Sequence, residues 1–436
     1  MTIYKDKLKL IAKVAELDKN YKFSILFELI DKVGLVKEYK KLNKKSACGI
    51  DGITVKEYGK NLEGNVEKLL VRIKEMKYRP QAARRVYIPK PGKSAPRPLG
   101  LPSVGDKLVQ SKLKGILEAI YEQDFLDCSH GFRPGRSCHT AIKEFNNAIM
   151  NKLINWVVEV DIKQFFDSVD HNVLYKMLKQ RISDPRILGL VWRILKAGVM
   201  EDGVVKISGK GTPQGGIISP LFANIYLHYA LDLWFELTFK TQAKGYVQLI
   251  RYCDDFVVVC ENECDAKQFL VQLKEQLASV KLEISEDKTQ ILKFGRDVWK
   301  QAKLTGEKVK SFDFLGFKLY QRETETGWLT LGVKTAKKAM ASKLKAWNKW
   351  LKDNRNVYAI KELWEKVKVG LIGHYNYFGV NGNMRCLRQY FNRVTMLFLK
   401  WLNRRSQKKS MNWKRYARYL QYNPLPKPRI CKSIWY

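Results

Sequence analysis

Two adjacent aspartates, Asp254 and Asp255, interrupt the otherwise apolar stretch YVQLIRYCDDFVVVC at residues 246–260. Successive side chains of a strand face opposite sides, so both acids reach one site only where the chain turns. The apolar segments VQLI and FVVV therefore predict two strands joined by a tight hairpin, with the acids at its tip. An ordinary turn, in which aspartate is common, is the simpler alternative.

A third carboxylate, Asp161, ends the apolar segment WVVEVD at residues 156–161. Carboxylates placed side by side repel one another, and a divalent cation removes that repulsion. Oxygen ligands alone suit Mg²⁺, which keeps water and substrate phosphates in its remaining positions. Two such ions, about 4 Å apart, hold the attacking and leaving oxygens of a phosphoryl transfer. We therefore expect Asp161, Asp254 and Asp255 to bind two Mg²⁺ ions, with Mn²⁺ as the alternative.

The chain is strongly basic. Its 436 residues contain 80 Lys and Arg against 43 Asp and Glu, a net charge of +37. Residues 331–436 hold 25 Lys and Arg but only 3 acids, so 22 of the 37 net charges lie there. Such a field favours nucleic acid first and anionic membrane second. No apolar run of membrane-spanning length and no signal peptide is present, which favours a soluble intracellular protein.

Short strands and helices alternate without the regular rhythm of a doubly wound sheet, so we expect an α+β fold. Residues 78–103 predict a basic hairpin, and Asp170 and Ser219 are predicted helix N-caps. Beyond residue 330, apolar residues every three or four positions predict three amphipathic helices. We divide the chain into a basic helical extension (1–45), a main α+β region (46–330), a helical region (331–404) and a basic tail (405–436). The eight cysteines form no C-x-x-C pair, so neither zinc nor a disulfide framework is expected.

An ordered series of segments resembles reverse transcriptases, and within them the group II intron-encoded reverse transcriptase/maturases. The segments are ACGIDGITVKEY, RRVYIPKPGK, RPLGLPS, HGFRPGRSCHTA, VVEVDIKQFFDSVDH, GTPQGGIISPLFANIYLHYALD, RYCDDFVVVC, SEDKTQILKFG, FDFLGF and GHYNYFGV. The resemblance covers nearly the whole chain and implies a right-hand polymerase. Fingers and palm would occupy residues 46–330, and an α-helical three-helix thumb, or X domain, residues 331–404.

The resemblance also implies roles for individual residues. Asp161 and Asp254 would be the main metal ligands, Asp255 the third acid, and Ile162 would add a backbone carbonyl. The implied nucleotide-binding residues are Lys90, Arg97, Phe166, Gln214 and Gly215, with Phe166 lying under the sugar and rejecting a 2′-hydroxyl. We expect nucleic-acid contacts from basic and aromatic residues of the matching segments and of the C-terminal region: Arg84, Arg85, Arg133, Arg136, Lys288, Tyr375, Tyr377, Arg404 and Arg405. The alternatives are a core phenylalanine for Phe166, a solvated basic hairpin for residues 78–103, and core packing for the C-terminal aromatics.

The implied activity is RNA-directed DNA polymerisation on an RNA template, from a DNA or RNA primer, with dNTPs. The implied further partner is group II intron RNA, bound to assist splicing and retrohoming by a bacterial cytoplasmic monomer or homodimer that binds no membrane. The sequence departs from the family's commonest pattern at Cys253, where Ala is usual, and no Cys and His ligands of an endonuclease domain follow the thumb. Two alternatives stay open: a splicing-only maturase without polymerisation, and a free-standing domesticated reverse transcriptase in DNA repair or phage defence.

Overall fold

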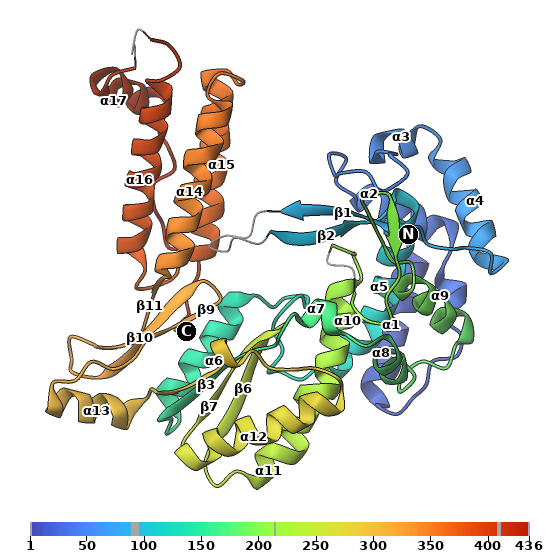
Figure 1. Ribbon diagram of the computed structural model, residues 1–436, viewed down its shortest axis with the longest axis horizontal. Coiled ribbons are helices and arrows are strands. Elements are labelled where there is room, and N and C mark those ends of the chain that lie inside the picture. The colour runs from blue at the N-terminus through green and yellow to red at the C-terminus, as the bar shows by residue number, and fades with distance from the viewer. Residues whose placement is uncertain (1, 89–95, 213–214, 408–410, 435–436) are drawn as a thin grey trace. The chain divides into compact units, whose positions relative to one another are not determined.

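The structure is a computed structural model that describes residues 2–88, 96–212, 215–407 and 411–434 (Figure 1). The described residues form two compact units. The first comprises residues 2–88, 96–137 and 158–291, and the second comprises residues 138–157 and 292–434. In the described part of the chain, no helix has both the length and the apolar character needed to cross a membrane.

The first unit contains a four-stranded sheet in the order β2-β1-β4-β5. Its strands are β1 (Ala83–Ile88), β2 (Arg97–Leu101), β4 (Val199–Glu201) and β5 (Val204–Lys206). Strands β1 and β2 are antiparallel, with Arg84 opposite Leu101 and Ile88 opposite Arg97. The basic hairpin predicted for residues 78–103 is therefore present, and its tip at residues 89–95 lies outside the described residues.

A second sheet has the order β6-β7-β3-β8 and carries the predicted acids. Its strands are β6 (Val247–Tyr252), β7 (Asp255–Cys260), β3 (Trp156–Asp161) and β8 (Gln290–Lys293). Three consecutive valines, Val257 to Val259, are fully buried on β7, so both faces of that strand are covered. This explains why the strand reads as a continuous apolar run instead of an alternating one.

Helices make up most of the rest of the first unit. They are α1 (Thr2–Leu17), η1 (Phe27–Leu29), α2 (Lys32–Lys41), α3 (Val55–Lys60), α4 (Leu62–Lys74), α5 (Val104–Asp124), α7 (Phe165–Ser168), α8 (His171–Leu178), α9 (Pro185–Leu195), α10 (Ser219–Leu227), η2 (His228–Asp232), η3 (Phe235–Phe239), α11 (Lys240–Gln242), α12 (Glu263–Ser279) and η4 (Glu286–Lys288). Asp170 caps α8 as predicted, because its side chain accepts hydrogen bonds from the backbone amides of Asn172 and Val173.

The prediction that Ser219 caps the next helix is wrong. Ile218 is the N-cap of α10 and makes no side-chain cap hydrogen bond, while Ser219 is already helical, with Pro220 in the first turn. The predicted long apolar helix also changes its winding, because residues His228–Asp232 and Phe235–Phe239 form π-helical turns. The wider turns change the direction in which the side chains beyond them project, relative to a regular α-helix.

The second unit combines a three-stranded sheet with helices. Its elements are α6 (Cys138–Asn151), α13 (Arg296–Thr305), β9 (Phe312–Phe314), β10 (Phe317–Glu323), β11 (Leu329–Thr335), α14 (Lys337–Asn354), α15 (Ile360–Phe378), α16 (Met384–Leu402) and α17 (Trp413–Tyr422). The unit extends beyond the region predicted to begin at residue 331 because aromatic packing joins α6 to this sheet. The ring of Phe145 lies 5.6 Å from that of Phe312 and 5.9 Å from that of Phe294.

Helices α14, α15 and α16 are the three amphipathic helices predicted from periodicity, and they run alongside one another (Figure 1). The segment after residue 405, predicted as a basic tail, contains a folded helix. Tyr416 of α17 is fully buried, packs against Trp364 with ring centroids 5.9 Å apart, and donates a hydrogen bond to the Thr395 carbonyl. Helix α17 is therefore part of the helical bundle.

Candidate active site

Asp254 lies in the two-residue turn between β6 and β7, and Asp255 begins β7. The two strands are antiparallel and in register, with Tyr252 opposite Asp255, so only Cys253 and Asp254 connect them. Cys253 has a φ of 57°, in the left-handed region, which produces the tight reversal. The predicted hairpin is confirmed, and it presents both acids at the same end of the sheet.

A buried arginine, Arg251, holds this turn in place through hydrogen bonds. Arg251 is fully buried and pairs with both carboxylate oxygens of Asp232, at 2.7 and 2.5 Å. Its guanidinium also donates hydrogen bonds to Asn224 at 3.2 Å and to the carbonyl of Cys253 at 3.1 Å. A guanidinium presents a rigid set of donors, so this network fixes the position of the turn relative to the preceding helix.

This pair was not predicted from the sequence. The available signal was a charged residue, Arg251, inside an apolar strand, together with an acid, Asp232, inside an apolar helix. Buried charges are almost always paired, so each residue predicts that a partner exists. Nothing in the spacing of the two residues says that they pair with each other.

Gly131 closes the other side of the turn. A Cβ atom at this position would lie 2.5 Å from the backbone nitrogen of Cys253, too close for any side chain. The Gly131 carbonyl accepts a hydrogen bond of 2.7 Å from Asn224, and the amide of neighbouring His130 donates one of 2.8 Å to the Arg251 carbonyl. The backbone of the HGF segment therefore packs closely against the acidic hairpin and supports it.

Asp161 ends β3, the strand next to β7 in the sheet, so the three acids come together. Desolvation, together with the nearby negative charges of Asp254 and Asp161, raises the pKa of the Asp255 carboxyl to about 7. The Asp255 side chain still reaches solvent, which weakens this effect relative to a fully enclosed carboxyl. Burial likewise raises the pKa of Asp254, and the charge of Asp161 adds to the increase.

Lys288 provides a positive charge at this cluster. It is the last residue of the short helix η4, and its ammonium forms an ion pair with the Asp161 carboxylate. The amide of nearby Ser285 donates a hydrogen bond of 2.7 Å to the Asp161 carbonyl, which holds the two segments together. Ile162, predicted to contribute its carbonyl to a metal, is buried and pairs with Ile284 in an isolated bridge.

The donor set suits a hard divalent cation, because three carboxylates meet and the pKa values of two of them are raised partly by mutual repulsion. Within the described ranges, however, no three His, Cys, Asp or Glu side chains are gathered tightly enough to hold a metal ion as they stand. The Asp161 carboxylate is directed instead to Lys288. Binding a metal there requires Asp161 to exchange its ammonium partner for the ion.

The nucleotide-binding residues predicted from the resemblance fall in two groups. Lys90 and Gln214 lie outside the described residues. Arg97 begins β2 and is close enough to Asp254 for its charge to lower that pKa, against the larger effect of burial. Phe166 is half-buried and meets the buried Phe165 edge to face, with centroids 5.5 Å apart.

Gly215 has a structural requirement of its own. Its φ is +109°, and a Cβ atom there would lie 2.7 Å from the carbonyl oxygen of Gly100 in β2. A side chain would therefore clash with the backbone of the basic hairpin. The glycine was predicted to allow close approach of substrate, and the structure shows a close approach of two protein segments.

The arginines predicted to bind nucleic acid differ in their surroundings. Arg84 donates hydrogen bonds of 2.9 and 3.3 Å to the carbonyl of Cys48. Arg133 is buried and pairs with Glu122 at 2.8 Å. Arg136 pairs with Asp127. Their charges are thus engaged within the protein, whereas Arg85 lines a cavity described below.

The residues of the second unit that were predicted to bind nucleic acid also differ in their exposure. Tyr375 is fully buried and donates a hydrogen bond of 3.0 Å to the Pro426 carbonyl, as expected of a core residue. Tyr377 is 37% exposed and stacks on Phe317 at an interplanar angle of 9°. Arg404 is exposed, and Arg405 donates a hydrogen bond of 3.0 Å to the Tyr358 carbonyl. Of these residues, Arg404 and Tyr377 offer the most exposed surface.

Acids at the ends of two neighbouring strands, beside an arginine and in a chain of net charge +37, are typical of enzymes that transfer nucleotides on nucleic acid. The family described as reverse transcriptase (RNA-dependent DNA polymerase) matches residues 88–319. The chain belongs to the reverse transcriptase family, and it is similar to a group II intron-encoded protein and to an intron maturase.

Individual relatives agree with this assignment. The group II intron-encoded protein LtrA of Lactococcus lactis is 46% identical over 170 residues, which is 38% of this chain and 27% of that protein. Protein YkfC of Escherichia coli is 34% identical over 276 residues, 56% of this chain and 71% of that protein. Nuclear intron maturase 1 of Arabidopsis thaliana is 36% identical over 95 residues, 22% of this chain and 13% of that protein. The chain thus matches about a quarter of the length of LtrA.

Proposed function

We propose that this chain is an RNA-directed DNA polymerase that extends a primer with dNTPs on an RNA template. The observation that carries the proposal is the meeting of Asp161 with Asp254 and Asp255 at neighbouring strand ends, with Arg97 close to Asp254. The proposal assigns fingers and palm to residues 46–330 and a thumb to residues 331–404. In this reaction the primer 3′-hydroxyl attacks the α-phosphate of the incoming dNTP, and pyrophosphate leaves.

In this proposal Asp161 and Asp254 hold two Mg²⁺ ions, or Mn²⁺ in their place, with Asp255 and the Ile162 carbonyl in supporting roles. Bound there, the ions would neutralise and align the oxygens of the reacting phosphates. The rigid turn fixed by Arg251 keeps the Asp254 carboxylate in one position during the reaction. Arg251 therefore positions the site without touching the substrate.

Side chains outside the carboxylate cluster would bind the nucleotide. Arg97, with Lys90 and Gln214, would contact the incoming dNTP, the two basic residues binding its triphosphate, because guanidinium and ammonium groups pair strongly with phosphate. Phe166 would lie under the sugar, where its ring leaves no room for a 2′-hydroxyl. Its half-buried position beside Phe165 supports this role, since Phe165 fills the core and leaves Phe166 at the surface.

A second role is supported by the basic C-terminal region. Residues 331–436 carry 22 of the 37 net charges, and exposed Arg404 lies in the turn that follows α16. Such a surface gives tight, salt-sensitive binding to phosphates. Together with the relatives named as intron proteins and maturases, this supports binding of intron RNA to assist splicing and retrohoming.

Primer extension on an RNA template tests the enzymatic proposal. Wild-type protein should extend a labelled primer only with added Mg²⁺ or Mn²⁺, and Asp254→Asn should lose at least about a hundredfold in rate, the upper range for residues that only support a metal ligand. Asp313→Asn, which changes an exposed acid of β9 in the same way, is the matched control and should retain activity. Absence of extension by wild type at any divalent-ion concentration would leave only the RNA-binding role.

A further inference from the structure

Residues 209–212 and residues 166–171 of the first unit are joined by backbone hydrogen bonds. The amide of Thr212 donates a hydrogen bond of 2.8 Å to the carbonyl of Phe166. Gly211, the residue before Thr212, has a φ of +92°, a conformation that favours glycine. The segment that leads into the predicted nucleotide-binding loop is thus held against the segment that carries the predicted sugar contact.

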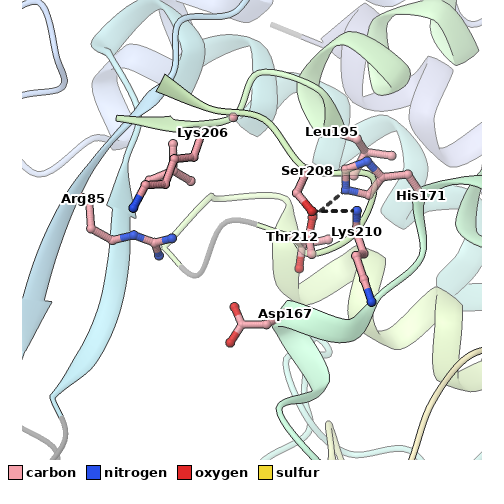
Figure 2. Close-up of a pocket in the computed structure, with 11 residues that line it drawn as sticks. Arg85, Asp167, His171, Leu195, Lys206, Ser208, Lys210 and Thr212 are labelled. Carbon is pink, nitrogen blue, oxygen red and sulfur yellow. Dashed lines mark hydrogen bonds between the residues drawn. The ribbon is translucent and has the colours of Figure 1, made fainter. Parts of the chain in front are cut away.

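His171 holds the same peptide group from its other side. The Nε2–H of His171 donates a hydrogen bond of 2.7 Å to the carbonyl of Gly211 (Figure 2). That carbonyl and the amide of Thr212 belong to one peptide group, which is planar, so the two groups turn together. A rotation of this peptide group therefore changes its contact with His171 and its contact with Phe166 at once.

The His171 side chain is itself well fixed. His171 is the first residue of α8, directly after the N-cap Asp170, and it is only 1% exposed. Burial lowers the pKa of its ring, so near neutral pH the ring is uncharged and has one N–H. The Nδ1 atom is buried without a hydrogen-bond partner among the described residues, so that N–H lies on Nε2, where the Gly211 carbonyl accepts it.

A partly open cavity of about 230 Å³ lies beside this peptide group (Figure 2). Gly211, Thr212 and His171 line it, together with Asp167 and Arg85. In a close-packed interior, neighbouring atoms alone restrict the rotation of a peptide group. On the cavity side such neighbours are missing, so the orientation of this peptide group depends on the hydrogen bond from His171.

We propose that His171 is a positioning residue for sugar selection, which rests on the proposed function because that function places Phe166 under the sugar of the incoming nucleotide. His171 orients the peptide group between Gly211 and Thr212, and this peptide group holds the backbone of Phe166. The Phe166 ring then fills the space that a 2′-hydroxyl would need. Since His171 acts through this peptide group and not on the reacting atoms, its loss changes which sugar is accepted more than the rate of phosphoryl transfer.

Primer extension by one nucleotide, with a dNTP and with the matching rNTP, tests this role. The discrimination factor is the kcat/KM for the dNTP divided by that for the rNTP. His171→Gln and His171→Asn form a matched pair, because the Gln amide nitrogen reaches as far as the imidazole Nε2 and the Asn amide nitrogen ends one atom short.

His171→Asn should lower the discrimination factor about fivefold, the effect of one hydrogen bond, while His171→Gln should stay within about twofold of wild type. The fall should come mainly from a lower KM for the rNTP. The kcat for the dNTP should change less than about threefold, because the carboxylates of the proposed active site are untouched.

Two further variants separate positioning from stability. Tyr121→Phe is the matched control, since it removes a hydrogen bond of 3.2 Å from a buried side chain to the carbonyl of Leu178, at the other end of α8. It should leave the discrimination factor unchanged even where it lowers the melting temperature. Gly211→Ala disturbs the peptide group without altering His171, because its Cβ atom would lie 3.3 Å from the Asp167 carbonyl oxygen. It should lower the discrimination factor as His171→Asn does.

Several results would overturn the role of His171. One is equal discrimination by wild type, His171→Asn and Gly211→Ala, and another is an equal fall in His171→Asn and His171→Gln. In a Phe166→Ala background, His171→Asn should have no further effect on discrimination, because it acts through that ring. An additive effect there would overturn the proposal too. Absence of extension by wild type would overturn the proposed function as well, whereas extension with unchanged discrimination would overturn only the role of His171.

Discussion

The guanidinium of Arg251 donates a hydrogen bond of 3.1 Å to the carbonyl of Cys253, the residue that precedes the acid at the hairpin tip. The same guanidinium is held by Asp232, and both side chains are completely buried. The geometry of the acidic turn thus depends on the buried ion pair between Arg251 and Asp232. Arg251 therefore contributes both to the stability of the protein and to the geometry of its active site.

Removing Arg251 should therefore have two effects that a second mutation separates. Arg251→Met leaves the buried Asp232 carboxylate unpaired and should reduce the free energy of unfolding by about 3–5 kcal/mol. Adding Asp232→Leu removes the unpaired charge and should recover most of that loss in urea unfolding. Primer extension should stay low in the double variant, because the Cys253 carbonyl still lacks its donor. Full recovery of activity would show that the arginine contributes only stability.

Cys253 should be chemically inert despite its place beside the acids. It is 2% exposed, and burial raises the pKa of its thiol, so the reactive thiolate is suppressed. Native protein treated with iodoacetamide should be alkylated at exposed Cys264 and not at Cys253, as measured by mass spectrometry. Cys253→Ala should keep primer extension within about threefold, since a small side chain fits the same space. Rapid labelling of Cys253 would contradict the buried position of this turn.

Asp255 should make stability depend on pH in metal-free buffer. An unfolded aspartate has a pKa of about 3.9, and the folded value is raised to about 7, so between these values the folded state retains a proton that the unfolded state releases. Raising the pH from 4 to 7 therefore lowers the stability of wild type relative to Asp255→Asn, and the difference levels off above pH 7. Urea unfolding in EDTA at constant ionic strength measures this. A difference independent of pH would show that the carboxyl is not perturbed.

Lys288 should compete with divalent cations for Asp161. Their ion pair is partly exposed, with 47% and 31% of the two side chains accessible, so its loss should cost under about 1 kcal/mol in EDTA. Lys288→Ala should, however, increase the rise in melting temperature that added Mg²⁺ produces, because the ion no longer displaces an ammonium. Lys274→Ala, which breaks the exposed pair with Glu286, is the matched control. An equal Mg²⁺ response in both variants would argue against competition at Asp161.

Much of the local structure followed from the sequence alone. Apolar runs flanking Asp254 predicted β6 and β7, and helical periodicity predicted α14 to α16, because both patterns depend on residues a few positions apart. The three acids could also be singled out as candidates, since carboxylates placed side by side repel one another unless a cation lies between them. The capping role of Ser219 failed because the backbone before α10 is already helical at Ile218, which the residue types do not reveal.

The tertiary structure decided which distant residues meet. The pairing of Arg251 with Asp232, the ion pair of Lys288 with Asp161 and the burial of Tyr416 in the helical bundle all join segments whose separation carries no periodic signal. So does the cavity at Arg85, which collects residues from strands, a helix and a loop. Local patterns encode strands, helices and turns because neighbouring residues share one backbone conformation. Contacts between distant segments depend on the path of the whole chain, which only the folded structure supplies.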